Sequence, residues 1–201
     1  MFTGIVRALG RVAETAPGRL GVESPSITPG LAVGGSVAVN GACLTVTQVE
    51  GDVFFADVVP ETFARTNLGE LAIGSQVNLE TPVTLQQPLD GHLVQGHVDG
   101  TARVLAVFEV ELGREVSIEL PKALARFVAE KGSIAVDGTS LTVAGLNEVS
   151  FTVALIPTTL SGSIAGSYQP GRVVNLEVDL LARYAERLVR ATTPQVGENE
   201  N

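Results

Sequence analysis

The chain is poor in the residues that several classes of protein require. It has one cysteine and cannot close an internal disulfide, which agrees with a reducing compartment. Its 13 Lys and Arg are outnumbered by 22 Asp and Glu. The resulting net charge of −9 argues against nucleic acid or an anionic membrane as a partner, because both need clustered basic residues. The chain has no glycine-rich loop of the phosphate-cradling type, which disfavours a phosphate ester as its ligand.

Long apolar segments and metal-ligand patterns are also missing. No uninterrupted apolar run is long enough to span a bilayer. The opening residues, MFTGIV, show no basic region followed by an apolar core, so we expect no secretory signal and a cytoplasmic protein. The two histidines, His92 and His97, fall on opposite faces of a regular strand. With only one cysteine beside them, we expect no metal site.

A stretch of twelve residues occurs twice. Residues 35–46 read GSVAVNGACLTV and residues 132–143 read GSIAVDGTSLTV, so eight of twelve positions are identical at an offset of 97. The same offset superimposes VNLE at 77–80 on VNLE at 174–177. A long unit present only twice indicates two similar domains, because solenoids repeat shorter units at least about three times.

This duplication sets the expected domain organisation. We expect a first domain over residues 1–90, a second over 91–178, a C-terminal helix over 179–191 and a disordered polar tail over 192–201. Each of the two domains is long enough to bury its own apolar core.

Each half reads as short strands separated by turn signals. In the first half the expected strands are residues 4–13, 19–23, 36–39, 43–49, 53–59 and 76–85. Asn40-Gly41 between apolar runs is the strongest short hairpin signal, and Pro60 opens a short helix, since proline is tolerated in the first turn. This pattern predicts an all-β fold of two similar six-stranded antiparallel Greek-key barrels, followed by a C-terminal α-helix.

Two further helices are expected in the second half. Residues 121–131 begin with proline, carry apolar side chains at helical spacing and precede Gly132, which places Lys131 at a helix carboxyl end. There Lys131 either complements the helix dipole or faces a ligand. The terminal helix carries apolar residues at heptad spacing from Leu181 to Ala191. Because isolated helices this short are marginal in water, we expect it to dock on a partner chain's copy in a small oligomer.

Strand alternation separates the chemistry-bearing residues from the core. In the strand after the first Asn-Gly turn, Leu44 and Val46 should fill the narrow barrel interior. Cys43 then points outward, as does Ser140 in the second copy. A ligand that touches them would lie in a cleft beside a barrel, for instance between the two domains. The alternative is a structural cysteine and strand hydroxyls bonded to the backbone.

At some positions the second copy has an ionisable side chain where the first copy has a neutral one. His97 occupies the place of Ile5, and Asp137 the place of Asn40. A histidine can move protons at neutral pH, and a nearby cysteine or serine would supply a nucleophile. The alternative for Asp137 is to hold a turn through its side chain. Asp179 is placed to cap the terminal helix.

Several motifs in order carry a resemblance to a known family. They are MFTGIV at the start, NGACLTV at 40–46, GHLVQGHVDG at 91–100, VDGTSLTV at 136–143 and VNLEVD at 174–179. Together they resemble the α-chain type of riboflavin synthase, over residues 1–190 and including the duplication. The resemblance implies two barrels and a C-terminal helix that holds a homotrimer. It implies dismutation of two 6,7-dimethyl-8-ribityllumazine molecules by four-carbon transfer, without cofactor or metal, and leaves open an association with lumazine synthase.

The resemblance also implies two lumazine pockets, the first barrel of one subunit facing the second barrel of a neighbour. The first pocket would comprise Gly4, Ile5, Val6, Ala42, Cys43, Leu44, Asp57, Val58, Val59, Pro60, Glu61 and Thr62. The second would comprise Gly96, His97, Val98, Lys131, Ser140, Leu141, Thr142, Ala154, Leu155, Ile156, Pro157, Thr158 and Thr159. For catalysis we expect His97 with Ser140 and Asp137 to transfer protons, Lys131 to lie in the same pocket, and Cys43 to act as nucleophile or positioner.

The chain departs from the family pattern in the second half. Residues 161–166 read SGSIAG in place of the usual Thr-Leu-Gly, Thr158 replaces the acidic residue matched by Glu61, and Asp90 replaces a glycine. These changes fall around the second pocket. The alternative function is that of non-catalytic relatives that hold lumazine or flavin, which are expected to lose the histidine and serine of that pocket.

Overall fold

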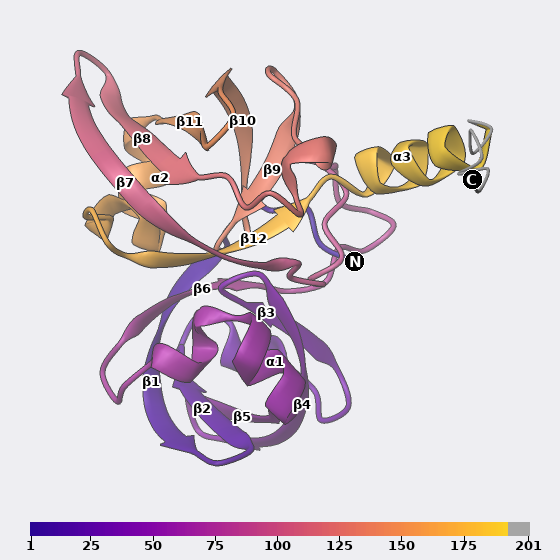
Figure 1. Ribbon diagram of the computed structural model, residues 1–201. Helices are drawn as coiled ribbons and strands as arrows, with labels where there is room; N and C mark the ends of the chain where they lie inside the picture. Colours follow the sequence, from indigo (N-terminus) through magenta and orange to yellow (C-terminus); the bar gives the residue numbers. More distant parts are fainter. Residues whose placement is uncertain (193–201) are drawn as a thin grey trace.

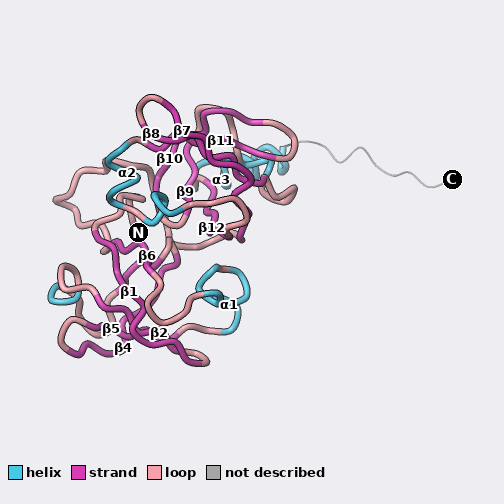
Figure 2. The backbone as a smooth tube through the Cα atoms, turned by 90° about the vertical axis from the view of Figure 1, so that its left-hand side faces the viewer, coloured by secondary structure: helices cyan, strands magenta, loops and turns pink. Residues whose placement is uncertain are grey.

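The computed structural model describes residues 1–192, and the remainder of the expected tail, residues 193–201, lies outside the described residues. Two β-barrels lie one above the other, and a C-terminal helix projects from the second (Figure 1). A view turned by 90° shows the same two bodies, with the N-terminus between them (Figure 2). None of the helices within residues 1–192 is long and apolar enough to cross a membrane.

The first barrel is a closed ring of antiparallel strands in the order β1-β2-β5-β4-β3-β6. Its strands are β1 (Ala8–Ala16), β2 (Arg19–Glu23), β3 (Ser36–Val39), β4 (Ala42–Glu50), β5 (Val53–Asp57) and β6 (Gln76–Glu80). The short helix α1 (Pro60–Arg65) and the 3-10 turns η1 (Thr28–Gly30) and η2 (Asn67–Glu70) lie in the connections.

The second barrel is a closed ring in the order β7-β8-β11-β10-β9-β12, which is the first order shifted by six strands. Its strands are β7 (Gly100–Val110), β8 (Gly113–Glu119), β9 (Ser133–Val136), β10 (Thr139–Leu146), β11 (Ser150–Leu155) and β12 (Val173–Val178). Helix α2 (Pro157–Gly162) and the turns η3 (Ala125–Phe127) and η4 (Ile164–Ser167) repeat the first connections. The expected duplicated Greek-key fold is confirmed.

Side-chain alternation places the apolar residues inside each barrel. Leu44 and Val46 on β4, and Leu141 and Val143 on β10, are all buried, whereas Thr45 between the first two is exposed. Each barrel interior is one continuous apolar cluster. Its burial stabilises the folded state by about 25 cal/mol for each Å² of apolar surface that is removed from water. The outer faces are therefore left for ligand contacts.

The two equivalent hairpins meet tip to tip between the barrels. Asn40 and Asp137 have the same left-handed backbone, with φ of 45°, and each precedes a glycine of positive φ, as a tight hairpin turn requires. A Cβ on Gly41 would lie 2.6 Å from the amide nitrogen of Gly138, so a larger residue here would push the barrels apart. The hairpins predicted from sequence thus also form part of the contact between the domains.

The terminal helix α3 (Leu180–Thr192) forms as expected. The carboxylate of Asp179 accepts a hydrogen bond from the Leu181 amide (2.9 Å), which confirms the predicted cap. Ion pairs tie α3 to the second barrel, including Arg183 with Asp99 at 3.0 Å. The side chains of Leu181 and Tyr184 remain largely exposed in a single chain.

The prediction of a helix over residues 121–131 is wrong. Only the 3-10 turn η3 forms there. The apolar side chains of Leu124 and Val128 cover one end of the second barrel, which needs no regular helix. Lys131 takes a left-handed backbone with φ of 66°, and its amide donates to the carbonyl of Val143 (2.8 Å), so the chain turns directly into β9.

Candidate functional site

Two crossing segments pass between the barrels: the residues before β1, which include Gly4, and the residues before β7, which include Gly96. Each forms a backbone hydrogen bond with the opposite barrel. The amide of Ser140 on β10 donates to the carbonyl of Gly4 (2.7 Å), and the amide of Cys43 on β4 donates to the carbonyl of Gly96 (2.9 Å). Both glycines have positive φ, and a Cβ would lie 2.6 Å from the Cβ of Ser140 or 2.5 Å from the Cβ of Cys43. Only glycine allows so close an approach in this conformation.

A buried glutamate holds each crossing segment. Glu80 at the end of β6 accepts from the amides of Thr3 (2.7 Å) and Gly4 (3.0 Å). Glu177 on β12 accepts from the amide of Gly96 (2.9 Å) in the same way. Burial raises the pKa of both carboxyls, while these hydrogen bonds oppose the rise. The two glutamates belong to the repeated VNLE, but the sequence did not reveal this function.

A cavity of about 230 Å³ opens where the first crossing segment meets the second barrel. It is lined by Gly4, Ile5 and Val6 from the crossing segment, Thr139 and Ser140 from β10, and Ile156, Thr158, Thr159, Gly162 and Ser163 around α2. Residues 4–6 were expected in the first-barrel pocket. The structure places them beside Ser140 instead, because the chain crosses before it enters β1.

Ser140 is paired with His92, which the sequence pattern did not place in the site. The hydroxyl Oγ of Ser140 lies 2.7 Å from Nδ1 of His92. The imidazole is half-buried, and among the described residues its Nε2 has no hydrogen-bond partner. Burial lowers the pKa of His92, although Asp179 opposes the shift, so the ring stays neutral at neutral pH. A neutral imidazole on a serine hydroxyl is the arrangement that allows proton transfer through serine.

The expected group of His97, Ser140 and Asp137 is not assembled within one chain. His97 is exposed and follows Gly96, on the segment that contacts Cys43 of the first barrel. Asp137 has no exposed surface and cannot touch a ligand. The Asp137 carboxylate does not hold its own turn either, because its hydrogen-bond partners are Asn67, Tyr168 and Asn175.

The Asp137 carboxylate lies in a buried polar network between the barrels. Its Oδ1 accepts from the side-chain amide of Asn67 and the backbone amide of Asn175 (both 2.8 Å), and Oδ2 accepts from the Tyr168 hydroxyl (2.7 Å). Burial raises its pKa from 3.8 to about 6 against these hydrogen bonds. Asn78 adds a bond from its amide to the Asp137 carbonyl (2.8 Å). The network fixes one barrel against the other, and with them the crossing segments.

The remaining predicted pocket residues divide by the face of the strand. Ala42, Leu44, Val58, Leu141 and Leu155 are buried. Cys43 is partly exposed, and Asp57, Val59, Pro60, Thr142, Ala154, Ile156 and Pro157 are exposed, while Thr62 and Val98 are partly exposed. Glu61 is exposed and forms an ion pair with Arg65. Lys131 donates from Nζ to the carbonyl of Ala144 (3.5 Å) and does not line the cavity at Ser140.

The altered loop at 161–166 keeps its local geometry. Ser163 donates its hydroxyl to the carbonyl of Thr159 (2.7 Å) and accepts from the amide of Ala165 (3.2 Å). Thr66 makes the equivalent pair of bonds in the first barrel. The departure from the family pattern therefore preserves the turn that lines the cavity.

Comparisons with known proteins agree with this architecture. The model of the lumazine binding domain matches twice, over residues 3–82 and 95–179. The riboflavin synthase of Mycobacterium tuberculosis is 50% identical over 199 residues, which cover 95% of this chain and 99% of that protein. The riboflavin synthase of Bacillus subtilis is 38% identical over 193 residues, covering 94% and 90%.

Solved structures show the same likeness. A crystal structure of LumP complexed with 6,7-dimethyl-8-(1'-D-ribityl) lumazine superimposes with a TM-score of 0.81 at 26% identity, over 89% of this chain and 99% of that one. LumP complexed with riboflavin gives a TM-score of 0.83 at 27% identity, with the same coverage. With two lumazine-binding domains and full-length similarity to these enzymes, the chain belongs to the riboflavin synthase family.

Proposed function

We propose that the chain is a riboflavin synthase that converts two molecules of 6,7-dimethyl-8-ribityllumazine into one riboflavin and one 5-amino-6-(ribitylamino)uracil. One lumazine donates a four-carbon unit to the other, and the atoms balance without an oxidant or reductant. The observation that carries the proposal is the cavity beside the Ser140–His92 pair, on a fold that matches a lumazine-bound structure. The lumazine ring is its own electron sink, so the reaction needs no cofactor.

Ser140 and His92 would remove the proton from the methyl group on ring carbon 7. The Ser140 hydroxyl gives its proton to Nδ1 of His92 as it takes the methyl proton, which leaves a carbanion delocalised into the ring. Because burial lowers the pKa of His92, the imidazole is already in the neutral form that accepts a proton. Such general-base assistance is worth about 10²- to 10⁴-fold in rate.

Cys43 would serve the second lumazine on the outer face of β4. There the thiol or an adjacent water adds to carbon 7 of the acceptor, and His97 lies on the segment hydrogen-bonded to Cys43. Two lumazines must face each other for the transfer. We propose that a homotrimer brings the first-barrel site of one subunit to the second-barrel site of its neighbour, with the exposed face of α3 as the contact. A cytoplasmic location and an association with lumazine synthase stay predictions.

The second candidate is a lumazine carrier without catalysis. It is favoured by the solved neighbours, which are LumP complexes with lumazine, riboflavin and flavin mononucleotide. The presence of Ser140, His92 and His97 favours the enzyme, since a carrier has no need for a serine–histidine pair.

Turnover with substrate alone separates the two candidates. Purified protein is mixed with 6,7-dimethyl-8-ribityllumazine, without added cofactor or metal, and both the lumazine and riboflavin are quantified by chromatography. The enzyme consumes two lumazines per riboflavin formed. Ser140→Ala should lose turnover, whereas Ser117→Ala, a partly buried serine on β8, should not. Tight lumazine binding without riboflavin would overturn the proposal in favour of the carrier.

A further inference from the structure

Both members of the Ser140–His92 pair are attached to the first crossing segment through their own backbones. The amide of Ser140 donates to the carbonyl of Gly4 (2.7 Å), and the amide of His92 donates to the carbonyl of Thr3 (3.1 Å). Thr3 and Gly4 are consecutive, so two neighbouring peptide units fix a residue of β10 and a residue of the connection between the barrels. A shift of this segment would therefore move both members of the pair.

A single carboxylate of the first barrel holds these two peptide units. Oε1 of Glu80 accepts from the amide and from the hydroxyl of Thr3 (both 2.7 Å), and Oε2 accepts from the amide of Gly4 (3.0 Å). The side chain is buried at the end of β6, and all three partners are donors, which suits an ionised carboxylate. Hydrogen bonds to an ionised group are about twice as strong as those between neutral groups.

The packing around the held segment leaves it little room to shift. A Cβ on Gly91 would lie 2.0 Å from the carbonyl oxygen of Thr3 and 3.0 Å from the Cβ of Ser140. Phe2 is fully buried, and its amide donates to the carbonyl of Val94 (2.7 Å). Because interiors this close-packed transmit displacements, the segment and the pair should move together.

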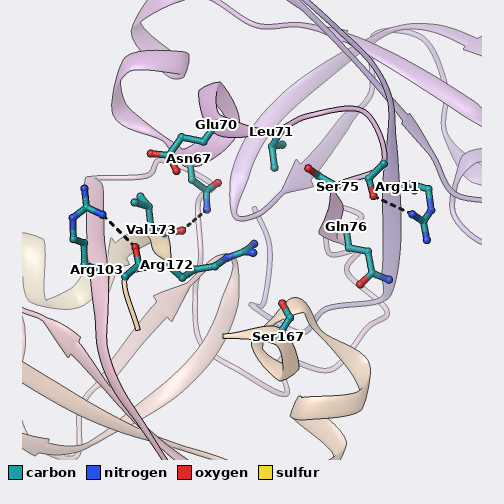
Figure 3. Close-up of a pocket in the computed structure, with 12 residues that line it drawn as sticks. Arg11, Asn67, Glu70, Leu71, Ser75, Gln76, Arg103, Ser167, Arg172 and Val173 are labelled. Atoms are coloured by element: carbon teal, nitrogen blue, oxygen red, sulfur yellow. Dashed lines mark hydrogen bonds between the residues drawn. The ribbon is translucent and has the colours of Figure 1, made fainter. Parts of the chain in front are cut away.

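Another part of the boundary between the barrels is less closely packed. A cavity of about 640 Å³ lies between the turns before β6 and β12, with Arg11 of one barrel and Arg103 of the other at opposite sides of the close-up (Figure 3). Side chains do not pack across this space. The crossing segments and the polar network around Asp137 therefore carry much of the positioning of one barrel relative to the other.

We propose that Glu80 of the first barrel is the positioning residue for the Ser140–His92 pair of the second. It acts through Thr3 and Gly4 and does not itself contact the reacting atoms. The proposal rests on the proposed function, since it names the residue that sets the geometry of the proton-transfer pair. A misplacement of about 1 Å at a catalytic group can cost about 10²-fold in rate. Loss of the carboxylate should therefore slow proton removal more than it weakens lumazine binding.

The duplication supplies a matched control. Glu177 on β12 accepts from the amides of Gln95 (2.7 Å) and Gly96 (2.9 Å), and the carbonyl of Gly96 accepts from the amide of Cys43. Glu177 and Glu80 are equally buried, at 4% and 5% exposure. Glu177→Gln thus removes the same kind of carboxylate at a similar cost in stability, but it acts on the segment beside the first-barrel site.

Deuterium exchange at the 7-methyl group, compared with riboflavin formation, tests the proposal in the full-length protein. Glu80→Gln should slow the exchange of bound lumazine by about 10²-fold, with a smaller change in the dissociation constant. Glu177→Gln should exchange at close to the wild-type rate and lose riboflavin formation instead. Glu119→Gln, at an exposed position on β8, should match wild type in both.

Two further measurements support the test if Glu80→Gln folds poorly. Thr3→Val removes the hydroxyl that donates to Glu80 but keeps the shape of the side chain, and it should slow the exchange by about tenfold. NMR of the imidazole signals follows both histidines of the chain without any lumazine. Glu80→Gln should raise the pKa of His92 toward its ordinary value, because burial is what lowers it, whereas Glu177→Gln should not.

The outcomes separate this proposal from the proposed function. Exchange at the wild-type rate in Glu80→Gln overturns the positioning role, and so does equal slowing by Glu80→Gln and Glu177→Gln, which would indicate a general loss of stability. An absence of exchange and turnover in wild type would instead contradict the proposed function. The histidine titration would then still decide whether Glu80 positions His92.

Discussion

Asp137→Asn should change the pH dependence of stability by a defined amount. The carboxyl is fully buried, and burial raises its pKa from 3.8 to about 6. A group whose pKa is raised on folding stabilises the native state fully below the unfolded pKa, and that contribution is lost as pH rises through the folded pKa. A shift of about two units is worth about 3 kcal/mol, at about 1.4 kcal/mol per unit. Wild type should therefore lose about 3 kcal/mol relative to Asp137→Asn between about pH 4 and pH 7.

The variant is suited to the comparison because asparagine already occupies the equivalent hairpin. Asn40 has the same φ of 45° as Asp137 and is equally buried. An asparagine at 137 keeps the oxygen that accepts from Asn175 and turns its amide toward Tyr168, whose hydroxyl is able to accept. Burial raises the pKa of Tyr168 well above its ordinary value, so that hydroxyl stays protonated throughout the range.

Urea unfolding followed by far-ultraviolet circular dichroism measures the effect, since the chain has no tryptophan to report by fluorescence. Wild type and Asp137→Asn are compared at equal protein concentration from about pH 4 to 7, and the difference in unfolding free energy is plotted. Asp52→Asn, in an exposed turn, serves as the control and should show a flat difference. A flat difference for Asp137→Asn would refute the reasoning, because burial would then not be disfavouring the ionised carboxylate.

Three further predictions concern the site and the assembly. His92→Ala should lower kcat by about 10²- to 10⁴-fold, and the acid limb of the wild-type pH–rate profile should lie below the ordinary histidine value of 6.5, because burial lowers the pKa of His92. A limb at or above 6.5 contradicts that assignment. Gly4→Ala places a Cβ 2.6 Å from the Ser140 Cβ, so it should cost about 1–3 kcal/mol more unfolding free energy than Gly18→Ala, whose φ is also positive but whose Cβ meets nothing within 4 Å. Equal losses would remove the contact as the cause. Tyr184→Asp on the exposed face of α3 should convert a trimer to monomers in sedimentation, and a persistent trimer would place the contact elsewhere.

The barrels were predictable because their signals are local. The strand alternation around Leu44 and the Asn40-Gly41 turn each act over a few residues, and each predicted its element correctly. The duplication then repeats the same local signals in the second half of the chain. Residues 121–131 misled because apolar spacing that suits a helix also suits an irregular loop over the end of a barrel. There the left-handed backbone at Lys131 was not visible in the pattern.

The site was less predictable because its contacts are long-range. Nothing local indicates that Gly4 pairs with Ser140 of the other barrel. His92 was overlooked because comparison of the repeats relies on a counterpart, and its position in the first repeat would precede the start of the chain. Asn67, although central to the inter-barrel network, stands opposite Ile164 in the repeat, so the alignment suggested no shared role.

The proposed mechanism depends on one step, in which Ser140 and His92 remove the proton from the methyl group on carbon 7. Proton NMR of 6,7-dimethyl-8-ribityllumazine in D₂O measures this step directly, as the rate at which the 7-methyl signal is lost. The acceleration is this rate divided by the rate without protein. Wild type should accelerate the exchange, and both Ser140→Ala and His92→Ala should reduce the acceleration by about 10²-fold or more, while Ser117→Ala retains it. Full acceleration in Ser140→Ala or His92→Ala would contradict the account and move the proton chemistry away from the crossing segment.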